Sequence, residues 1–496
     1  MSKILLVTTG GGESIANRLL AKSGIARGEV FKEPFPDGET YHRLVTPVTN
    51  SEAVVVGAGG FGNPDALMEL YDVANLLSDE GALGLTLVVP EDNGKSKQAR
   101  FLKRVQSRLF ASVPVTPLGN RVVEVDPDCP SMPFYKSMSG KAPKTKQVNG
   151  GAAALDLFGS RGNAVTFATK SYGYMQDQFH TLAADKLDRG EVLRAEDGIV
   201  KGLGQSVEGR DVVIIGGTID HAETFDLYLI ANAAYEAGAL SLTLVIPYFG
   251  YSTMERGKPD AREAVKASYR ARLISSIPRC PMGNRVVMCD LHSEGIPHYF
   301  GNGIRATHLY CIKSIIMEMV KGVYGGRICT TDAGRGKWAE SLVKDINKRL
   351  LAEGTKSADA LWQAAFALKD RKSGSETELL GVLGDVRMMN IDLFDDMIRR
   401  GSTAIDAAKG YRNGTPDDPV SGCLQIRFVA SHGVLPGNAL ERLRTAVDHK
   451  GEALFSEVIV TDSHPNAVKL AGDFLKVKPI APLLVAHVLQ SLAIGN

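Results

Sequence analysis

Residues 389–410 read Met-Asn-Ile-Asp-Leu-Phe-Asp-Asp-Met-Ile-Arg-Arg-Gly-Ser-Thr-Ala-Ile-Asp-Ala-Ala-Lys-Gly. A short apolar run leads to two adjacent carboxylates, then to a turn with Gly, Ser and Thr, and then to apolar residues at helical spacing. This order predicts a strand, a loop and a helix. In an open α/β sheet such a loop lies at the carboxyl end of a strand, where ligands bind, and the first N–H groups of the helix favour a phosphate.

The side chains around this turn suit a sugar phosphate. The hydroxyls of Ser402 and Thr403 add donors to the N–H groups of the predicted helix start. Asp395 and Asp396 can accept hydrogen bonds from sugar hydroxyls or hold a hydrated cation. An acidic turn with a helix N-cap is the alternative, and the stretch alone leaves both interpretations open.

Length and composition place the chain among ordinary globular proteins. At 496 residues it is too long for one core, so we expect two or three domains. The formal net charge of +1 gives no electrostatic reason to expect a nucleic-acid or membrane partner. The six cysteines show no metal-type spacing, and we find no leader and no membrane-length apolar run, so we expect free thiols and a cytoplasmic protein.

Segments from the first 130 residues recur in the same order further along the chain. Residues 81–90 match residues 238–247, and residues 112–123 match residues 276–287. Such a repeat predicts two copies of one α/β domain, followed by a third α/β domain. The predicted division is 1–136 for the first copy, 137–151 for a polar linker, 152–308 for the second copy and 309–496 for the C-terminal domain.

The two copies differ in loops where chemistry is expected. After residue 247 the second copy continues with Tyr-Phe-Gly-Tyr and gains seven residues before the alignment resumes. Only the second copy carries Asp290-Leu291-His292. Glu39 of the first copy aligns with Ile199 of the second, so each copy keeps residues that the other lacks.

Eight short motifs occur in the order found in the ribose-phosphate pyrophosphokinases, also named phosphoribosyl diphosphate synthases, and the chain resembles that family over nearly its whole length. The resemblance implies an α/β fold of phosphoribosyltransferase-like domains with mainly parallel sheets. A duplicated first domain is the largest departure from the family. The motifs are Phe35-Pro36-Asp37-Gly38-Glu39, Pro247-Tyr248-Phe249-Gly250-Tyr251, Asp290-Leu291-His292, Asp332-Ala333-Gly334, Lys369-x-Arg371, Asp395-Asp396-Met397-Ile398, Ser431-His432-Gly433 and Pro482-Leu483-Leu484.

The resemblance implies transfer of the β,γ-diphosphate of ATP to the anomeric hydroxyl of ribose 5-phosphate. Such a transfer depends on alignment and charge neutralisation more than on covalent chemistry. By resemblance, His292 and Asp332 hold Mg²⁺ on the ATP phosphates, and Lys369 and Arg371 stabilise the transferred charge from a mobile loop. A structural histidine and a solvated charge run are the alternatives for these residues taken alone.

Two further sets of residues receive roles from the resemblance. In the family, adenine lies between the Phe-x-Asp-Gly-Glu loop of one subunit and the region after Tyr-Phe-Gly-Tyr of its neighbour. Because each copy keeps one of these, we infer that the copies pair within one chain, with a repeat kept for size or assembly as the alternative. The expected ATP-binding residues are Phe35, Asp37, Glu39, Tyr251 and Arg256, and the expected sugar-phosphate residues are Asp395, Asp396, Arg399, Arg400, Gly401, Ser402 and Thr403.

Two departures from the family concern its substrates. Thr253-Met254 stands where the family has an Arg-Gln pair that contacts ATP, and Arg256 is a possible replacement. Arg399-Arg400 supplies more positive charge than one phosphate monoester requires, which suits a larger acceptor. ADP-ribose is such an acceptor, in an enzyme similar to those implied in phage-encoded NAD rescue. Arginines that point to solvent or bridge subunits are the alternative.

Other function classes stay open on the sequence alone. A non-catalytic relative similar to synthase-associated regulatory proteins is one, although the catalytic-type residues are retained. A phosphoribosyltransferase that consumes the activated sugar is another, because it shares the loop type. We expect ATP, Mg²⁺ and a ribose phosphate as ligands, a homo-oligomer, and neither nucleic acid nor membrane as a partner.

Overall fold

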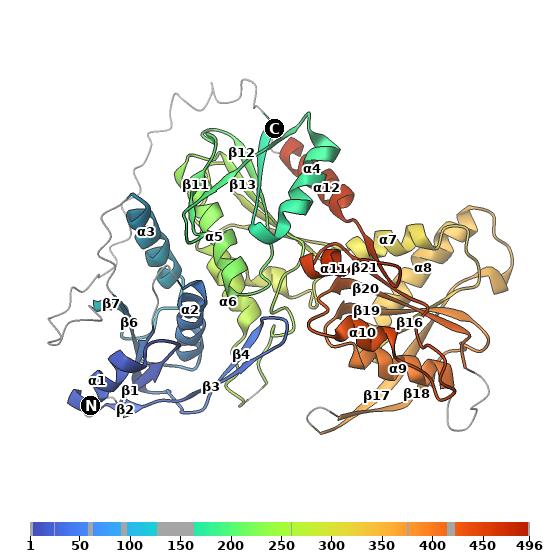
Figure 1. Cartoon of the computed structure of the whole chain (residues 1–496), viewed down its shortest axis with the longest axis horizontal. Helices are drawn as coiled ribbons and strands as arrows, with labels where there is room; N and C mark the ends of the chain where they lie inside the picture. Colours follow the sequence, from blue (N-terminus) through green and yellow to red (C-terminus); the bar gives the residue numbers. More distant parts are fainter. Residues whose placement is uncertain are drawn as a thin grey trace. The chain divides into compact units, whose positions relative to one another are not determined.

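The computed structural model of the chain is shown in Figure 1. It describes residues 3–23, 25–57, 63–90, 97–125, 163–258, 260–373, 376–413 and 422–494. The chain divides into two compact units, Met1–His308 with Leu484–Asn496, and Leu309–Leu483. The predicted linker 137–151 and the turn at residues 91–94 of the first copy lie outside the described residues.

The first unit begins with a five-stranded parallel sheet in the order β2-β1-β5-β6-β7. A two-stranded antiparallel hairpin, β3–β4, separates its second and third strands in sequence. The strands are β1 Lys3–Thr8, β2 Ala26–Arg27, β3 Val30–Pro34, β4 Thr40–Leu44, β5 Ser51–Val56, β6 Gly84–Pro90 and β7 Asn120–Val125. The helices are α1 Glu13–Ser23, α2 Pro64–Asp79 and α3 Lys97–Ala111.

A six-stranded sheet follows in the order β15-β14-β13-β12-β8-β9. Strands β12 and β13 are buried at every residue, as expected for strands covered on both faces. The strands of this sheet are β8 Ala164–Ala168, β9 Leu187–Arg189, β12 Asp211–Ile215, β13 Ser241–Ile246, β14 Asn284–Cys289 and β15 Arg305–Leu309. A separate antiparallel hairpin is formed by β10 Val192–Arg194 and β11 Val200–Leu203. The helical segments are η2 Lys170–Tyr172, α4 Gly173–Ala183, α5 His221–Glu236, α6 Lys266–Ser275 and η3 Ile296–Tyr299.

The two sheets share one topology. The order β9-β8-β12-β13-β14 corresponds strand by strand to β2-β1-β5-β6-β7. In each region a hairpin, β3–β4 or β10–β11, follows the second strand in sequence. Local capping also corresponds, because Asn63 and Asp220 each accept a hydrogen bond from the N–H three residues on, at 3.1 and 2.8 Å. The two regions therefore use the same local chemistry to begin their central helices.

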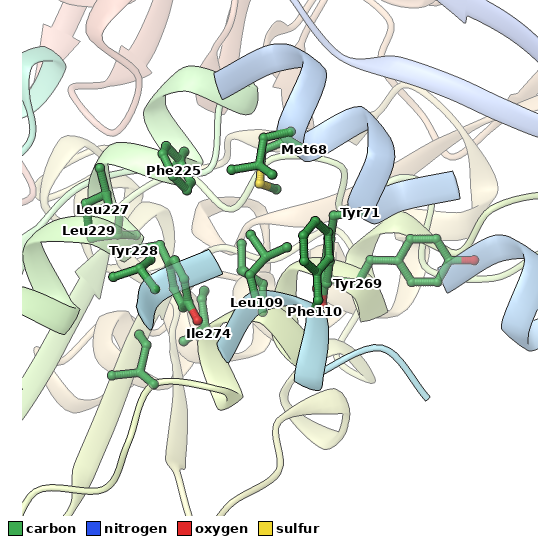
Figure 2. Packing of buried hydrophobic residues seen from close by; sticks show 14 of the residues in the cluster. Met68, Tyr71, Leu109, Phe110, Phe225, Leu227, Tyr228, Leu229, Tyr269 and Ile274 are labelled. Atoms are coloured by element: carbon green, nitrogen blue, oxygen red, sulfur yellow. The ribbon is translucent and has the colours of Figure 1, made fainter. Parts of the chain in front are cut away.

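One apolar core runs through both regions of the first unit. Its buried residues come from the first sheet with α2 and α3 and from the second sheet with α5 and α6. Figure 2 shows Met68, Tyr71, Leu109 and Phe110 of the first region beside residues of α5 and α6. The two predicted N-terminal copies are therefore packed together in one compact unit.

The second unit contains a seven-stranded sheet in the order β18-β17-β16-β19-β20-β21-β22, parallel except for β17–β18. The strands are β16 Arg327–Thr330, β17 Gln363–Ser373, β18 Glu376–Leu383, β19 Asn390–Ile398, β20 Gln425–Gly433, β21 Glu457–Thr461 and β22 Leu475–Lys478. The helical segments are α7 Cys311–Met319, η4 Ala333–Arg335, α8 Gly336–Ala352, η5 Ala358–Ala360, α9 Ser402–Asn413, α10 Ala439–Arg444 and α11 Pro465–Leu470. Helix α12 Ala481–Ile494 belongs mostly to the first unit.

The predicted fold class is confirmed: the chain is α/β with mainly parallel sheets. Two local predictions differ from the structure. The carboxylates of Asp395 and Asp396 lie within β19, which continues to Ile398, because the backbone stays paired with β20 there. Lys369 and Arg371 lie in strand β17, paired with β18, and not in an irregular loop. Among the described residues, no helix combines the length and apolar character needed to cross a membrane.

Candidate active site

The carboxyl ends of β16 and β19 bring three aspartates to one edge of the second sheet. These strands are parallel neighbours, with Thr330 opposite Phe394, so the residues that follow each strand share that edge. Asp332 lies just past β16, and its Oδ1 accepts a hydrogen bond from the N–H of Gly334 at 2.8 Å. The Asp395 carboxylate accepts one from the N–H of Asp396 at 2.9 Å.

The two adjacent aspartates have different electrostatic surroundings. Asp396 is buried, and its Oδ2 lies 2.6 Å from Nη2 of Arg335. Burial raises the pKa of Asp395 well above its usual range, and the neighbouring Asp396 and Asp332 carboxylates raise it further. The ionised form of Asp395 is therefore disfavoured, and a nearby cation or hydrogen-bond donor would stabilise it.

A three-residue turn, Arg399–Gly401, connects β19 to helix α9. Gly401 has φ +76°, a left-handed conformation that glycine adopts without strain. The N–H of Leu435 donates to the carbonyl of Ile398 at 2.9 Å and holds the turn against the end of the next strand. Ser402 and Thr403 are exposed in the first turn of α9, whose leading N–H groups lack intrahelical partners.

Two of the predicted basic site residues lie in this turn, and two lie in another strand pair. Arg399 is half-buried, whereas Arg400 is exposed. Lys369 and Arg371 lie opposite Leu379 and Thr377 in the backbone register of the β17–β18 ribbon. Their roles toward a ligand stay predictions.

Sequence reasoning missed Arg335 and a buried polar group at the ends of β20 and β21. His432 shares a hydrogen bond of 2.7 Å with Ser463, whose neighbour His464 is also buried, and burial lowers the pKa of His464 to about 3. The Ser-His-Gly motif at residues 431–433 signalled part of this group. Nothing in the local pattern signals Arg335, because its ion pair joins two different strand ends.

In the first unit, the hairpin loop of the first region contacts the second region. Glu39 is buried, and its Oε1 accepts a hydrogen bond from the N–H of Tyr251 at 2.5 Å. Tyr251 is buried and has φ +60°, a costly conformation for a tyrosine that this contact helps to hold. Phe35 and Asp37 are half-buried, whereas the side chain of Arg256 is 88% exposed beside Glu255.

Strand β4 extends this contact by backbone pairing with residues 262–264. The N–H of Leu44 donates to the carbonyl of Arg262, and the N–H of Ala264 donates to the carbonyl of His42, both at 3.0 Å. The hydroxyl of Tyr41 donates to Glu263 at 2.9 Å. The segment that the second region gains after β13 is therefore fixed on the hairpin of the first.

The predicted metal ligands belong to different units. His292 is half-buried after β14, where the N–H of Leu291 donates to Nε2 of His308 at 2.9 Å. Asp332 belongs to the second unit, so its pairing with His292 stays a prediction. The described residues contain no cluster of three or more potential ligands. Mg²⁺ commonly uses one or two carboxylates with phosphates and water, and the Asp332 and Asp395 edge offers such donors.

In comparisons with known proteins, the chain is similar to proteins that share one name. A model of the N-terminal domain of ribose phosphate pyrophosphokinase matches residues 167–277. The chain is 29% identical over 306 residues to a ribose-phosphate pyrophosphokinase of Hyphomonas neptunium, covering 60% of this chain and 87% of that protein. It is 28% identical over 310 residues to a protein of the same name from Caldanaerobacter subterraneus, covering 62% and 87%.

A solved structure shows the same fold. The phosphoribosylpyrophosphate synthetase of Mycobacterium smegmatis superposes with a TM-score of 0.53 at 21% identity, covering 67% of this chain and 99% of that one. The predicted resemblance is thus confirmed by sequence and by fold. These matches identify the chain as a relative of the ribose-phosphate pyrophosphokinase family.

Proposed function

We propose that the chain transfers the β,γ-diphosphate of ATP to the anomeric hydroxyl of ribose 5-phosphate and releases AMP. The observation that carries this proposal is the edge formed by β16 and β19, where Asp332 follows β16 and where Asp395 and Asp396 precede the turn into α9. The names of the curated relatives agree with it. The anomeric oxygen bonds to the β-phosphorus, the bridge to the α-phosphate breaks, and the hydroxyl proton passes to water.

The second unit supplies the sugar site in this proposal. Asp395 and Asp396 accept hydrogen bonds from the ribose hydroxyls, because both carboxylates lie just before the turn. The N–H groups and hydroxyls at Gly401, Ser402 and Thr403 receive the 5-phosphate. Formation of such hydrogen bonds would relieve the charge that burial makes unfavourable on Asp395.

The first unit supplies the nucleotide site. We propose that its two regions are copies of one domain and that the junction of Glu39 with Tyr251 forms one wall of an adenine pocket. Phe35, Asp37 and Arg256 border that wall. By the family resemblance, His292 and Asp332 hold Mg²⁺, which neutralises charge on the phosphates, and Lys369 and Arg371 stabilise the transferred group.

A larger acceptor is the second candidate, because Arg400 is exposed beside the sugar-phosphate turn. A guanidinium in that position can bind a diphosphate that extends beyond the ribose, as in ADP-ribose. Turnover of ADP-ribose with loss of that turnover in Arg400→Ala would favour it. Turnover of ribose 5-phosphate alone would exclude it.

The deciding experiment measures AMP formation from ATP and Mg²⁺ with ribose 5-phosphate, with ADP-ribose and without acceptor. Wild type is compared with Lys369→Ala and with Lys344→Ala, an exposed lysine of α8 that serves as a matched control. We expect acceptor-dependent AMP, lost in Lys369→Ala and kept in Lys344→Ala. If no acceptor yields AMP, the diphosphate-transfer proposal fails and a regulatory role takes its place.

A further inference from the structure

A buried cluster of charges joins the two regions of the first unit. Asp72 of α2 is fully buried, and its two carboxylate oxygens lie 2.7 and 3.0 Å from the Nη atoms of Arg270 on α6. Nζ of Lys266, also on α6, lies 3.0 Å from Asp72 Oδ2. All three side chains are inaccessible to solvent, so their charges depend on one another.

The cluster continues into the proposed nucleotide wall. The guanidinium of Arg270 lies 4.5 Å and the ammonium of Lys266 lies 5.1 Å from the centre of the Tyr251 ring. Burial alone would raise the pKa of Asp72, but the Arg270 and Lys266 charges hold it well below its usual range. The carboxylate is therefore ionised and depends on cations from the other region.

Near this cluster, the contact between the regions contains two matching sets of polar contacts, one in each half. In each half an arginine of one region bonds to an asparagine and a carboxylate on the central helix of the other, as two-fold related surfaces do. The contacts are Arg272 to Asn75 and Asp79, both at 3.1 Å, and Arg108 to Asn232 at 2.7 Å and to Glu236 at 3.0 Å.

The charge cluster breaks this match. By the sequence repeat, the positions of Asp72, Lys266 and Arg270 correspond to Leu229, Leu102 and Gln106. Leu102 and Leu229 are both buried in the shared apolar core. At these three positions one half of the contact carries charged side chains, whereas the other half carries two leucines and a glutamine.

We propose that Asp72, Lys266 and Arg270 form a pairing code that lets the first region pair with a second region and with no other partner. Two first regions would bury each Asp72 against Leu102 and Gln106 without a cation. Two second regions would bury each Lys266 and Arg270 against Leu229 without a carboxylate. Both mispairings leave buried charges without an opposite charge, whereas the observed pairing places the Asp72 carboxylate against both cations.

The test uses two full-length chains with different affinity tags, one carrying Asp72→Arg and the other Arg270→Asp. Within either chain alone, the code places like charges together, so we expect loss of most soluble protein. When the two are co-expressed, the first region of each chain matches the second region of the other. We expect soluble protein that contains both tags in a 1:1 ratio.

Tagged wild-type chains measure the background association, and Asp79→Arg with Arg272→Asp is the matched control. That pair is about a third exposed, so we expect each control variant to stay soluble alone and to gain no mixed complex above wild type. Two results would overturn the pairing code. One is a soluble Asp72→Arg or Arg270→Asp chain that behaves as wild type alone. The other is loss of both chains without rescue on co-expression, which would leave the cluster a role in stability only.

Discussion

Replacing Gly401 by alanine tests whether the turn after β19 positions the sugar-phosphate site. At φ +76° an alanine is strained by about 1–2 kcal/mol. Its Cβ would also lie 3.1 Å from Cγ and Cδ2 of Leu443, a buried side chain of α10. Crowding of that kind costs about 1–3 kcal/mol, so we expect a total loss of about 2–5 kcal/mol in unfolding free energy.

Gly451→Ala is the matched control for this substitution. Gly451 has φ +81°, but nothing lies within 4 Å of its added Cβ, so only the strain of about 1–2 kcal/mol applies. For a unit of this size, each kcal/mol lowers Tm by about 2–4 °C. We expect Gly401→Ala to lower Tm further than Gly451→Ala does in thermal scans.

Steady-state kinetics distinguish a role of this turn in binding the sugar phosphate from a loss of stability alone. A shifted turn displaces Ser402 and Thr403, so KM for the ribose phosphate should rise about tenfold or more, which corresponds to ~1.4 kcal/mol of lost binding. KM for ATP should stay unchanged, and Gly451→Ala should change neither constant. If Gly401→Ala loses stability but keeps wild-type KM for every acceptor, the turn does not bind the sugar phosphate and the reasoning is wrong.

Three further predictions follow from the charges. Arg270→Met leaves buried Asp72 undercompensated and should cost about 3 kcal/mol in chemical denaturation, against about 0–1 kcal/mol for the partly exposed Arg272→Met. Because the pKa of Asp395 is raised in the folded state, its contribution to stability is present at low pH and is lost as pH rises through that pKa. Asp395→Asn should therefore unfold at a higher Tm than wild type at pH 8, with the difference vanishing near pH 4, while AMP formation falls. Lys369→Ala should lower AMP formation by about 10²–10³-fold without a change in Tm, which a stopped assay with thermal scans would check.

Much of the fold could be predicted from local pattern. The mainly apolar sequence of β13 and the alternation of turns and helices around it are set by residues near one another in sequence. The caps Asn63 and Asp220 mark the starts of α2 and α5 in the same way. The turn between β19 and α9 could be predicted because Gly401, Ser402 and Thr403 lie in one short stretch.

The misplaced elements share a physical cause. Asp395 and Asp396 were expected after a strand, because carboxylates are rarely buried within one. Arg335, from a different strand end, compensates Asp396 and permits the strand to continue. The charge run at Lys369 and Arg371 resembles a solvated loop, yet pairing with β18 makes it a strand. In both places a contact between distant residues overrides the local preference.

In the first unit, the residues of the proposed nucleotide site occur in only one half of the contact between the two regions, although the regions have similar topology. Glu39, Tyr251 and the Asp72 cluster all belong to one half of the contact between the regions. In the opposite half, Ile199 and Leu229 take the positions of Glu39 and Asp72 and join the apolar core. Because Arg270 contacts both Asp72 and the Tyr251 ring, the residue that selects the pairing also supports the proposed nucleotide wall. A chain paired in any other way would lose that wall, so the pairing code and the site depend on the same side chains.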